Sequence, residues 1–148
     1  KKAVIINNRM PENTINLIEK YFKGKLKNNV LILGLTYKED VEDTRFSPSL
    51  KLIQTLQGSC KKISCHDPML DNFNFESVTF EKNLPDSENY DLIILSVPHI
   101  EYKKIKYDDW LMSFKGLLID SNNILNKEQI LQLQTLNINF KIIGRGDI

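Results

Sequence analysis

The sequence predicts an α/β fold in which helices cover both faces of a doubly wound, mainly parallel β-sheet. Three observations favour this fold. Short apolar runs of strand length recur along the chain, segments with helical spacing of apolar residues lie between them, and polar residues follow the runs directly. The runs lack polar alternation, which is typical of strands buried on both faces. A chain of 148 residues is long enough to bury a core of its own.

Five segments have the pattern of buried strands. The first is residues 29–34, with the sequence NVLILG. The other predicted strands are residues 62–65, 91–95, 116–119 and 138–142. Residues 71–89 contain many loop-forming residues and no such run, so we expect an irregular segment there.

The first helix is predicted within residues 1–23. Thr14, Leu17 and Ile18 recur at helical spacing after Pro11, a residue that a first helical turn tolerates. Residues 1–10 also fit a strand because they include β-branched side chains, and periodicity over so short a stretch leaves both alternatives open. We favour the helix.

The clearest helix begins at Ser47 and Pro48. Ser47 can cap exposed N–H groups, Pro48 fits the first helical position, and apolar residues follow on one face until Gly58 ends the helix. Shorter helices are predicted over residues 101–105, 108–113 and 127–136. Since strands alternate with helices of this length, we expect right-handed crossover connections and a parallel sheet.

The composition excludes several classes of partner. Lys and Arg number 20 against 19 Asp and Glu, and a net charge of +1 predicts no nucleic-acid partner. No apolar stretch approaches the ~20 residues that span a bilayer, and the first residues lack a signal-peptide pattern, so we expect a cytoplasmic protein without membrane contact. Cys60 and Cys65 form neither a CxxC pair nor a metal-binding set, which fits reduced thiols. Because the chain does not begin with Met, we expect it to be part of a longer protein.

Polar residues collect directly after the predicted strands. In open α/β sheets, ligands bind beyond the carboxyl ends of the strands, so residues at these positions predict one binding surface. They are Thr36, Tyr37 and Lys38 after the first strand, His66 and Asp67 after the second, Ser96 and His99 after the third, and Asp120, Ser121, Asn122 and Asn123 after the fourth.

The connection from residue 35 to residue 46 is about twice the usual length of a strand-to-helix loop. It carries Lys38 and Arg45 and leads to the helix start at Ser47, where free N–H groups favour an anion. We therefore predict a phosphate or pyrophosphate that both cations face. The alternative from the same residues is a solvated loop of mutual ion pairs. Gly34 is the only glycine here, which excludes an ordinary dinucleotide fingerprint.

Residues 33–49, with the sequence LGLTYKEDVEDTRFSPS, resemble the segment that opens the C-terminal domain of the UDP-glucose/GDP-mannose dehydrogenase family. Shorter similarities follow in the expected order at residues 66–68, 120–125 and 143–146. Residues 7–11 resemble the branch that oxidises UDP-N-acetyl-aminosugars. The resemblance implies a Rossmann-like nucleotide-sugar domain over residues 26–148, preceded over residues 1–25 by a helical lead-in that ends an inter-domain helix.

Such a family would imply an NAD-dependent enzyme that oxidises the C6 hydroxyl of a UDP-sugar to a carboxylate, in two hydride transfers, for surface polysaccharide precursors. The intact enzyme is expected to be a homodimer. Its N-terminal and middle domains would hold most of the NAD and the catalytic cysteine, so this chain alone is expected to be inactive. By position, Tyr37 and Lys38 would line the nucleotide-sugar site and Arg45 would reach towards NAD. Asn122 stands where the family often has an arginine, and it completes the predicted substrate contacts.

The other notable side chains have structural interpretations. We expect Cys65 to be a buried strand residue and His66 to be structural, and we expect His99 to lie at the surface. Trp110 is expected to pack with Leu111 and Phe114, and two histidines without ligand spacing predict no metal site. A function of another class also fits the residues, namely a stand-alone α/β module that binds a nucleotide or a protein without catalysis.

Overall fold

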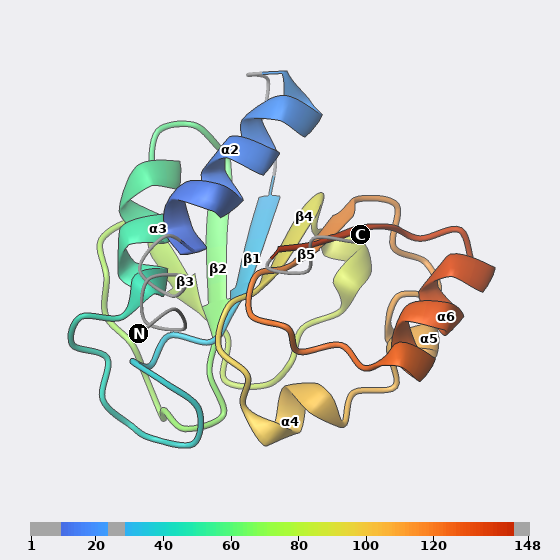
Figure 1. Cartoon of the computed structure of the whole chain (residues 1–148). Helices are drawn as coiled ribbons and strands as arrows, with labels where there is room; N and C mark the ends of the chain where they lie inside the picture. The colour runs from blue at the N-terminus through green and yellow to red at the C-terminus, as the bar shows by residue number, and fades with distance from the viewer. Residues whose placement is uncertain (1–9, 24–28, 144–148) are drawn as a thin grey trace.

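The computed structural model describes residues 10–23 and 29–143, and within these ranges six parallel strands form one sheet with the order β3-β2-β1-β4-β5-β6 (Figure 1). The strands are β1 (Asn29–Leu33), β2 (Lys62–His66), β3 (Val78–Phe80), β4 (Leu92–Leu95), β5 (Leu117–Asp120) and β6 (Asn139–Ile142). The chain starts in the middle of the sheet, builds outward to β3, and returns to build the other half. The predicted doubly wound, Rossmann-like fold is confirmed.

The strand register aligns the carboxyl ends of the central strands. Leu33 at the end of β1 pairs with His66 at the end of β2 and with Leu95 at the end of β4. Leu95 in turn pairs with Asp120 at the end of β5. The polar residues that follow these strands therefore emerge at one edge of the sheet, as the sequence predicts.

Helices cover both faces of the sheet (Figure 1). On one face, α2 (Met10–Phe22) and α3 (Pro48–Leu56) pack over the sheet through residues such as Ile18 and Ile53. On the other face lie α4 (Ile100–Lys103), α5 (Tyr107–Trp110) and α6 (Lys127–Thr135), which bury Tyr102, Tyr107 and Leu133. Successive residues of β1 alternate between the two cores, which explains why the strand is apolar without interruption.

Helix α3 begins where its sequence predicts. The Ser47 side chain accepts a hydrogen bond from the Ser49 amide at 3.1 Å, and Pro48 occupies the first helical position. Helix α6 begins with a capping box, in which Asn126 and Gln129 each accept the other's backbone amide. Both ends are thus fixed by local hydrogen bonds.

One predicted feature is wrong and another is partly outside the described residues. Residues 71–89 were expected to be irregular, but Val78–Phe80 forms β3 against β2, and Ser87–Asn89 forms a 3₁₀ turn. The first helix is confirmed from Met10, with Thr14 and Ile18 buried, whereas residues 1–9 lie outside the described ranges. Among the described helices, none has the length and apolar character needed to cross a bilayer.

Candidate functional site

The 35–46 loop joins β1 to α3 across the carboxyl edge of the sheet. Its first residues are buried, with Leu35 and Thr36 fully inaccessible to solvent. It then turns outward, so that the Tyr37 side chain is 56% exposed and Phe46, at the far end, is 89% exposed. A rigid base therefore carries an exposed aromatic and cationic tip.

A pocket of about 280 Å³ lies beside this loop, and we call it the carboxyl-edge pocket. The loop contributes Tyr37 and Lys38 to its lining, and Pro48 at the start of α3 closes one side. The segments after β4 and β5 contribute Val97 and Asn122. The structure thus brings together three residues that the sequence predicts to bind substrate: Tyr37, Lys38 and Asn122.

Asn122 is held in place by the protein. Its side-chain Nδ2 donates to the Ser96 carbonyl at 3.2 Å, and its backbone amide donates to Asp120 Oδ1 at 3.1 Å. Asp120 is fully buried and also accepts the amides of Ile124 and Leu125. The turn after β5 is therefore a rigid wall of the pocket.

Arg45 lies outside the described lining of the carboxyl-edge pocket. Its side chain is 80% exposed and forms a two-pronged contact with Asp43, with Nε 3.0 Å from Oδ1 and Nη2 3.0 Å from Oδ2. The hydrogen bond from the Arg45 side chain lowers the pKa of the Asp43 carboxyl. Of the two cations expected to face one anion, Lys38 lies at the pocket and Arg45 forms the kind of loop ion pair that the alternative interpretation describes.

The start of α3 has fewer free donors than the sequence suggests. The Ser49 amide is bonded to the Ser47 hydroxyl, and Pro48 has no N–H. Lys38, rather than the helix start, therefore supplies the positive charge at the carboxyl-edge pocket.

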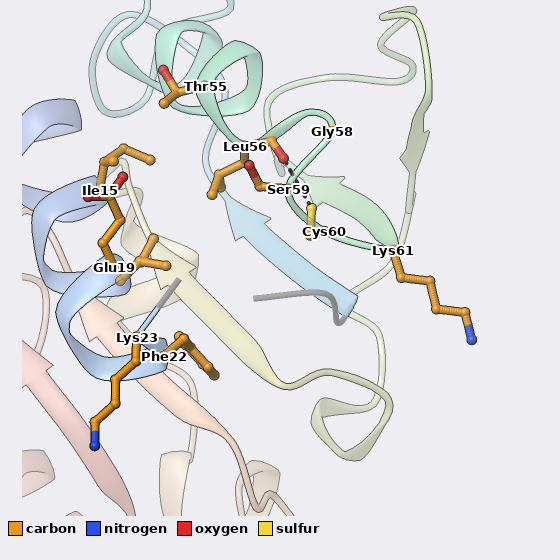
Figure 2. A pocket seen from close by; sticks show the side chains of 11 residues that line it. Ile15, Glu19, Phe22, Lys23, Thr55, Leu56, Gly58, Ser59, Cys60 and Lys61 are labelled. Atoms are coloured by element: carbon orange, nitrogen blue, oxygen red, sulfur yellow. Dashed lines mark hydrogen bonds between the residues drawn. The ribbon is translucent and has the colours of Figure 1, made fainter. Parts of the chain in front are cut away.

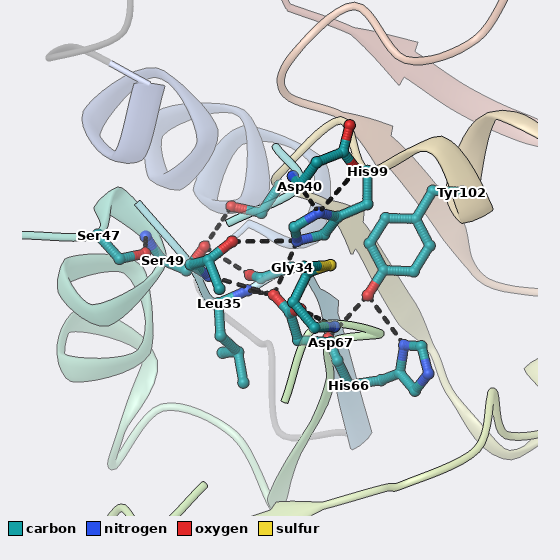
Figure 3. A network of polar contacts seen from close by, with 12 residues as sticks. Gly34, Leu35, Asp40, Ser47, Ser49, His66, Asp67, His99 and Tyr102 are labelled. Atoms are coloured by element: carbon teal, nitrogen blue, oxygen red, sulfur yellow. Dashed lines mark hydrogen bonds and ion pairs between the residues drawn. The ribbon is translucent and has the colours of Figure 1, made fainter. Parts of the chain in front are cut away.

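Asp67 anchors the base of the loop (Figure 3). Its carboxylate is fully buried and accepts the amides of Leu35 at 2.7 Å, Thr36 at 3.2 Å and Met69 at 2.8 Å. His99 Nε2 lies 2.9 Å from Asp67 Oδ2. Burial by itself raises the pKa of Asp67, but the hydrogen bonds from His99 and the backbone amides offset this effect, so the pKa lies below its usual value.

His99 is fully buried, so the expectation of a surface histidine is wrong. The 35–46 loop folds over the ring, and the Asp40 amide donates to His99 Nδ1 at 3.0 Å. Thr36 Oγ1 lies 3.1 Å from Nε2 (Figure 3 shows the ring between Asp40 and Asp67). Sequence reasoning placed His99 and Asp67 at one edge of the sheet, but nothing in the spacing showed that a loop 60 residues earlier covers them.

The crossing of the loop over the sheet edge depends on close backbone contacts. Gly34 has φ +105°, and a Cβ atom built there would lie 2.6 Å from Val97 Cβ. The Ser49 hydroxyl donates to the Gly34 carbonyl at 2.7 Å and lies 2.6 Å from the Ser96 hydroxyl. These contacts join β1, β4 and α3 beneath the pocket.

The structural interpretations of the other side chains agree with the structure. His66 is buried with Nδ1 2.9 Å from the Tyr102 hydroxyl, and burial lowers its pKa. Cys65 is buried in β2, and burial raises the pKa of its thiol to about 12, which suppresses nucleophilic reactivity. Trp110 packs against the core beside Leu111 and Phe114.

A larger pocket of about 760 Å³ lies between α2 and α3, and we call it the amino-edge pocket (Figure 2). Ile15, Ile18 and Phe22 of α2 line one side, and Leu56 and Cys60 line the other. It lies near the amino end of β2, opposite the edge where ligands bind to open α/β sheets. We therefore place the candidate ligand site at the smaller carboxyl-edge pocket, where the polar residues converge.

Within the described ranges, no group of three or more His, Cys, Asp or Glu side chains is arranged to hold a metal ion. The similarity at residues 143–146 and that at residues 7–11 lie largely outside the described residues. The site therefore consists of the residues around the 35–46 loop.

Comparison with known proteins gives a consistent result. Residues 31–127 match the model of the UDP-glucose/GDP-mannose dehydrogenase family, UDP binding domain. A UDP-N-acetyl-D-mannosamine dehydrogenase from Methanococcus aeolicus is 33% identical over 99% of this chain and 33% of its own length. A UDP-glucose 6-dehydrogenase from Rickettsia typhi is 32% identical over 86% of this chain and 31% of its own.

A solved structure shows the same architecture. The UDP-D-ManNAc dehydrogenase from Pyrococcus horikoshii superposes with a TM-score of 0.75 and 26% identity, over 95% of this chain and 32% of that chain. The chain thus spans about one third of the length of the curated relatives that it matches.

Proposed function

Since this chain belongs to the UDP-glucose/GDP-mannose dehydrogenase family, we propose that it binds the nucleotide diphosphate part of a UDP-sugar at the carboxyl-edge pocket. The observation that carries this proposal is the convergence of Tyr37, Lys38 and Asn122 on that pocket. These residues come from loops that follow two strands, β1 and β5, which lie on either side of β4. The pocket has the position at which open α/β sheets bind ligands.

Each of the three side chains offers a distinct interaction. The Lys38 ammonium is a flexible point charge that suits a phosphate group. Tyr37 presents an exposed ring and hydroxyl, which can contact a base or a sugar. Asn122 presents an amide held at a fixed position by Ser96. Together they supply positive charge, an aromatic surface and a polar wall, which are the chemical needs of a nucleotide sugar.

The 35–46 loop does not suit the pyrophosphate of NAD. In a dinucleotide-binding loop, backbone N–H groups after the first strand point at the pyrophosphate. Here the amides of Leu35 and Thr36 donate to the buried Asp67 carboxylate instead. The beginning of this loop therefore lacks that cradle for NAD, and we assign most NAD binding to another domain of a longer protein.

We further propose that the longer protein is a cytoplasmic NAD-dependent UDP-sugar 6-dehydrogenase that supplies polysaccharide precursors. In that enzyme, this chain would bind and orient the nucleotide, while its own N-terminal and middle domains would supply the reacting thiol and the second subunit would complete a homodimer. Arg45 is exposed and carried on the loop tip, so it is our choice for a contact with NAD across the domain boundary. The chain alone is expected to be catalytically inactive.

Calorimetric titration of UDP into the 148-residue chain tests the binding proposal. Replacement Lys38→Met removes the ammonium and retains much of the side-chain volume, and we expect UDP to bind about tenfold more weakly, which corresponds to about 1.4 kcal/mol. Lys62→Met is the matched control, because Lys62 is exposed at the amino end of β2 on the opposite edge of the sheet. Equal UDP affinity in both variants would show that the pocket is wrongly assigned.

A further inference from the structure

We propose that His99 is a positioning residue whose buried ring, held by Asp67, fixes the backbone on both sides of Lys38 and so orients Lys38 and Tyr37 for the ligand. This inference rests on the proposed function of the carboxyl-edge pocket. It differs from a general structural role because it assigns a separate task to each ring nitrogen.

The proton positions on the ring follow from its partners. The Asp40 amide can only donate, so Nδ1, at 3.0 Å, must accept. The ring proton therefore lies on Nε2, which faces Asp67 Oδ2 at 2.9 Å and Thr36 Oγ1 at 3.1 Å. The Asp67 carboxylate can only accept, and it thereby selects the tautomer whose Nδ1 is available for the loop.

Two anchors flank Lys38 along the chain. Before it, the Thr36 hydroxyl donates to the Lys38 carbonyl at 2.9 Å, and the same oxygen lies within reach of His99 Nε2. After it, the Asp40 amide donates to His99 Nδ1. One imidazole ring thus connects to the backbone two residues before and two residues after the lysine.

The anchors are buried although the residues that they carry are exposed. His99 and Asp67 are fully inaccessible, whereas Tyr37 and Lys38 face solvent. Hydrogen bonds in a low-dielectric interior do not compete with water and hold their geometry better than exposed ones. Asp40 has φ +58°, a conformation that a non-glycine residue adopts only when its surroundings require it. The Asp40 side chain accepts the Ile100 amide at 3.5 Å, which adds a weaker tie to the start of α4.

This arrangement lowers the cost of binding. A free loop would lose backbone and side-chain freedom when its ligand binds, and that loss would weaken the affinity. The His99 ring imposes part of this order before the ligand arrives. We therefore expect a substitution at His99 to weaken UDP binding even though the ring itself lies below the pocket.

Two substitutions separate the tasks of the ring nitrogens. His99→Asn places an amide oxygen near the Nδ1 position, so it can still accept the Asp40 amide. His99→Gln places an amide nitrogen near the Nε2 position, so it can still donate to Asp67 but no longer holds the loop. We expect UDP to bind at least tenfold more weakly to His99→Gln and within about threefold of the unaltered affinity to His99→Asn.

Hydrogen exchange of the Asp40 amide, followed by NMR in the 148-residue chain without ligand, provides a readout that needs no UDP. We expect protection to fall at least tenfold in His99→Gln and to persist in His99→Asn. His66→Asn is the control for loss of a buried histidine, because His66 contacts Tyr102 and not the loop. It should alter stability and leave both Asp40 protection and UDP affinity unchanged.

The two proposals fail in different ways. If the unaltered chain does not bind UDP, the proposed function fails, and Asp40 protection still decides whether His99 orders the loop. If UDP binds and the Asn and Gln variants lose affinity equally, or if Asp40 protection is the same in both, the positioning role is overturned. Should neither His99 variant fold, Thr36→Val replaces them. It removes the hydroxyl that bonds the Lys38 carbonyl, and unchanged UDP affinity in that variant would overturn the inference.

Discussion

Replacement of Asp67 by asparagine tests how the base of the 35–46 loop is held. The substitution preserves the shape of the side chain and removes its charge. If the remaining oxygen occupies the Oδ2 position, it keeps the bonds from Leu35, Thr36 and His99. The new NH₂ group then faces the Met69 amide, which loses its acceptor.

The expected loss of stability follows from these four bonds. A buried amide without an acceptor costs about 1 to 3 kcal/mol, and each of the three bonds that loses its charged partner weakens by about 1 kcal/mol. Removal of a buried charge also removes its desolvation cost, which offsets part of the loss. We therefore expect Asp67→Asn to lower the free energy of unfolding by about 3 kcal/mol, which corresponds to roughly 6 to 12 °C in Tm for a chain of this size.

Urea denaturation of both proteins between pH 7 and pH 3 measures this effect. The folded pKa of Asp67 lies below the unfolded value of about 3.9, so its carboxylate stabilises the fold above that pH. This stabilisation disappears as the pH falls through the folded pKa. The difference between the two proteins should thus be largest at pH 7 and narrow below about pH 4.

Asp91→Asn is the matched control, since the Asp91 side chain accepts one bond, from the Asn29 amide at 3.2 Å, and we expect it to cost about 1 kcal/mol or less. An Asp67→Asn penalty that does not exceed the Asp91→Asn penalty at pH 7 would refute the reasoning. A penalty that stays constant down to pH 3 would also refute the assignment to charge.

Three further predictions follow from the same structure. Burial lowers the pKa of His66, so protonation is more costly in the folded state, and stability should decline as the pH falls below about 6.5. Urea midpoints against pH should show this decline in the unaltered chain and lack it in His66→Asn. Gly34→Ala forces a Cβ atom against Val97 at a φ of +105°, and circular dichroism melting should show a loss of about 3 kcal/mol or more, whereas Gly58→Ala, also at positive φ but in open space, should cost less. The Cys65 thiol should resist alkylation until the chain unfolds, because burial raises its pKa to about 12, whereas half-buried Cys60 should react first; mass spectrometry of iodoacetamide-treated protein would contradict this if Cys65 reacted as fast as Cys60.

The strands and the main helix were predictable because local patterns determine them. The apolar run of β1 is uninterrupted since its residues face two cores in alternation, and Ser47 with Pro48 marks the start of α3 directly in the sequence. β3 escaped prediction because it has three residues, none of them fully buried, and so it lacks an apolar run. Its position depends on pairing with β2, which is a tertiary contact.

The candidate site was predictable in its position and less so in its internal contacts. Parallel strands bring their carboxyl ends to one edge, which places Tyr37, Lys38 and Asn122 near one another. The burial of His99 depends on how the 35–46 loop folds back over β4, and spacing along the chain does not encode that path. The direction of Arg45 depends on its contact with Asp43, since an acidic loop offers several partners to one guanidinium.

Mapping of backbone amide shifts in the 148-residue chain during a UDP titration tests the central claim most directly. The account predicts that the amides of Tyr37, Lys38, Val97 and Asn122, which border the carboxyl-edge pocket, shift most and follow one saturation curve. Shifts that concentrate instead around Ile18, Leu56 and Cys60 at the amino-edge pocket, or no shifts at millimolar UDP, would contradict it.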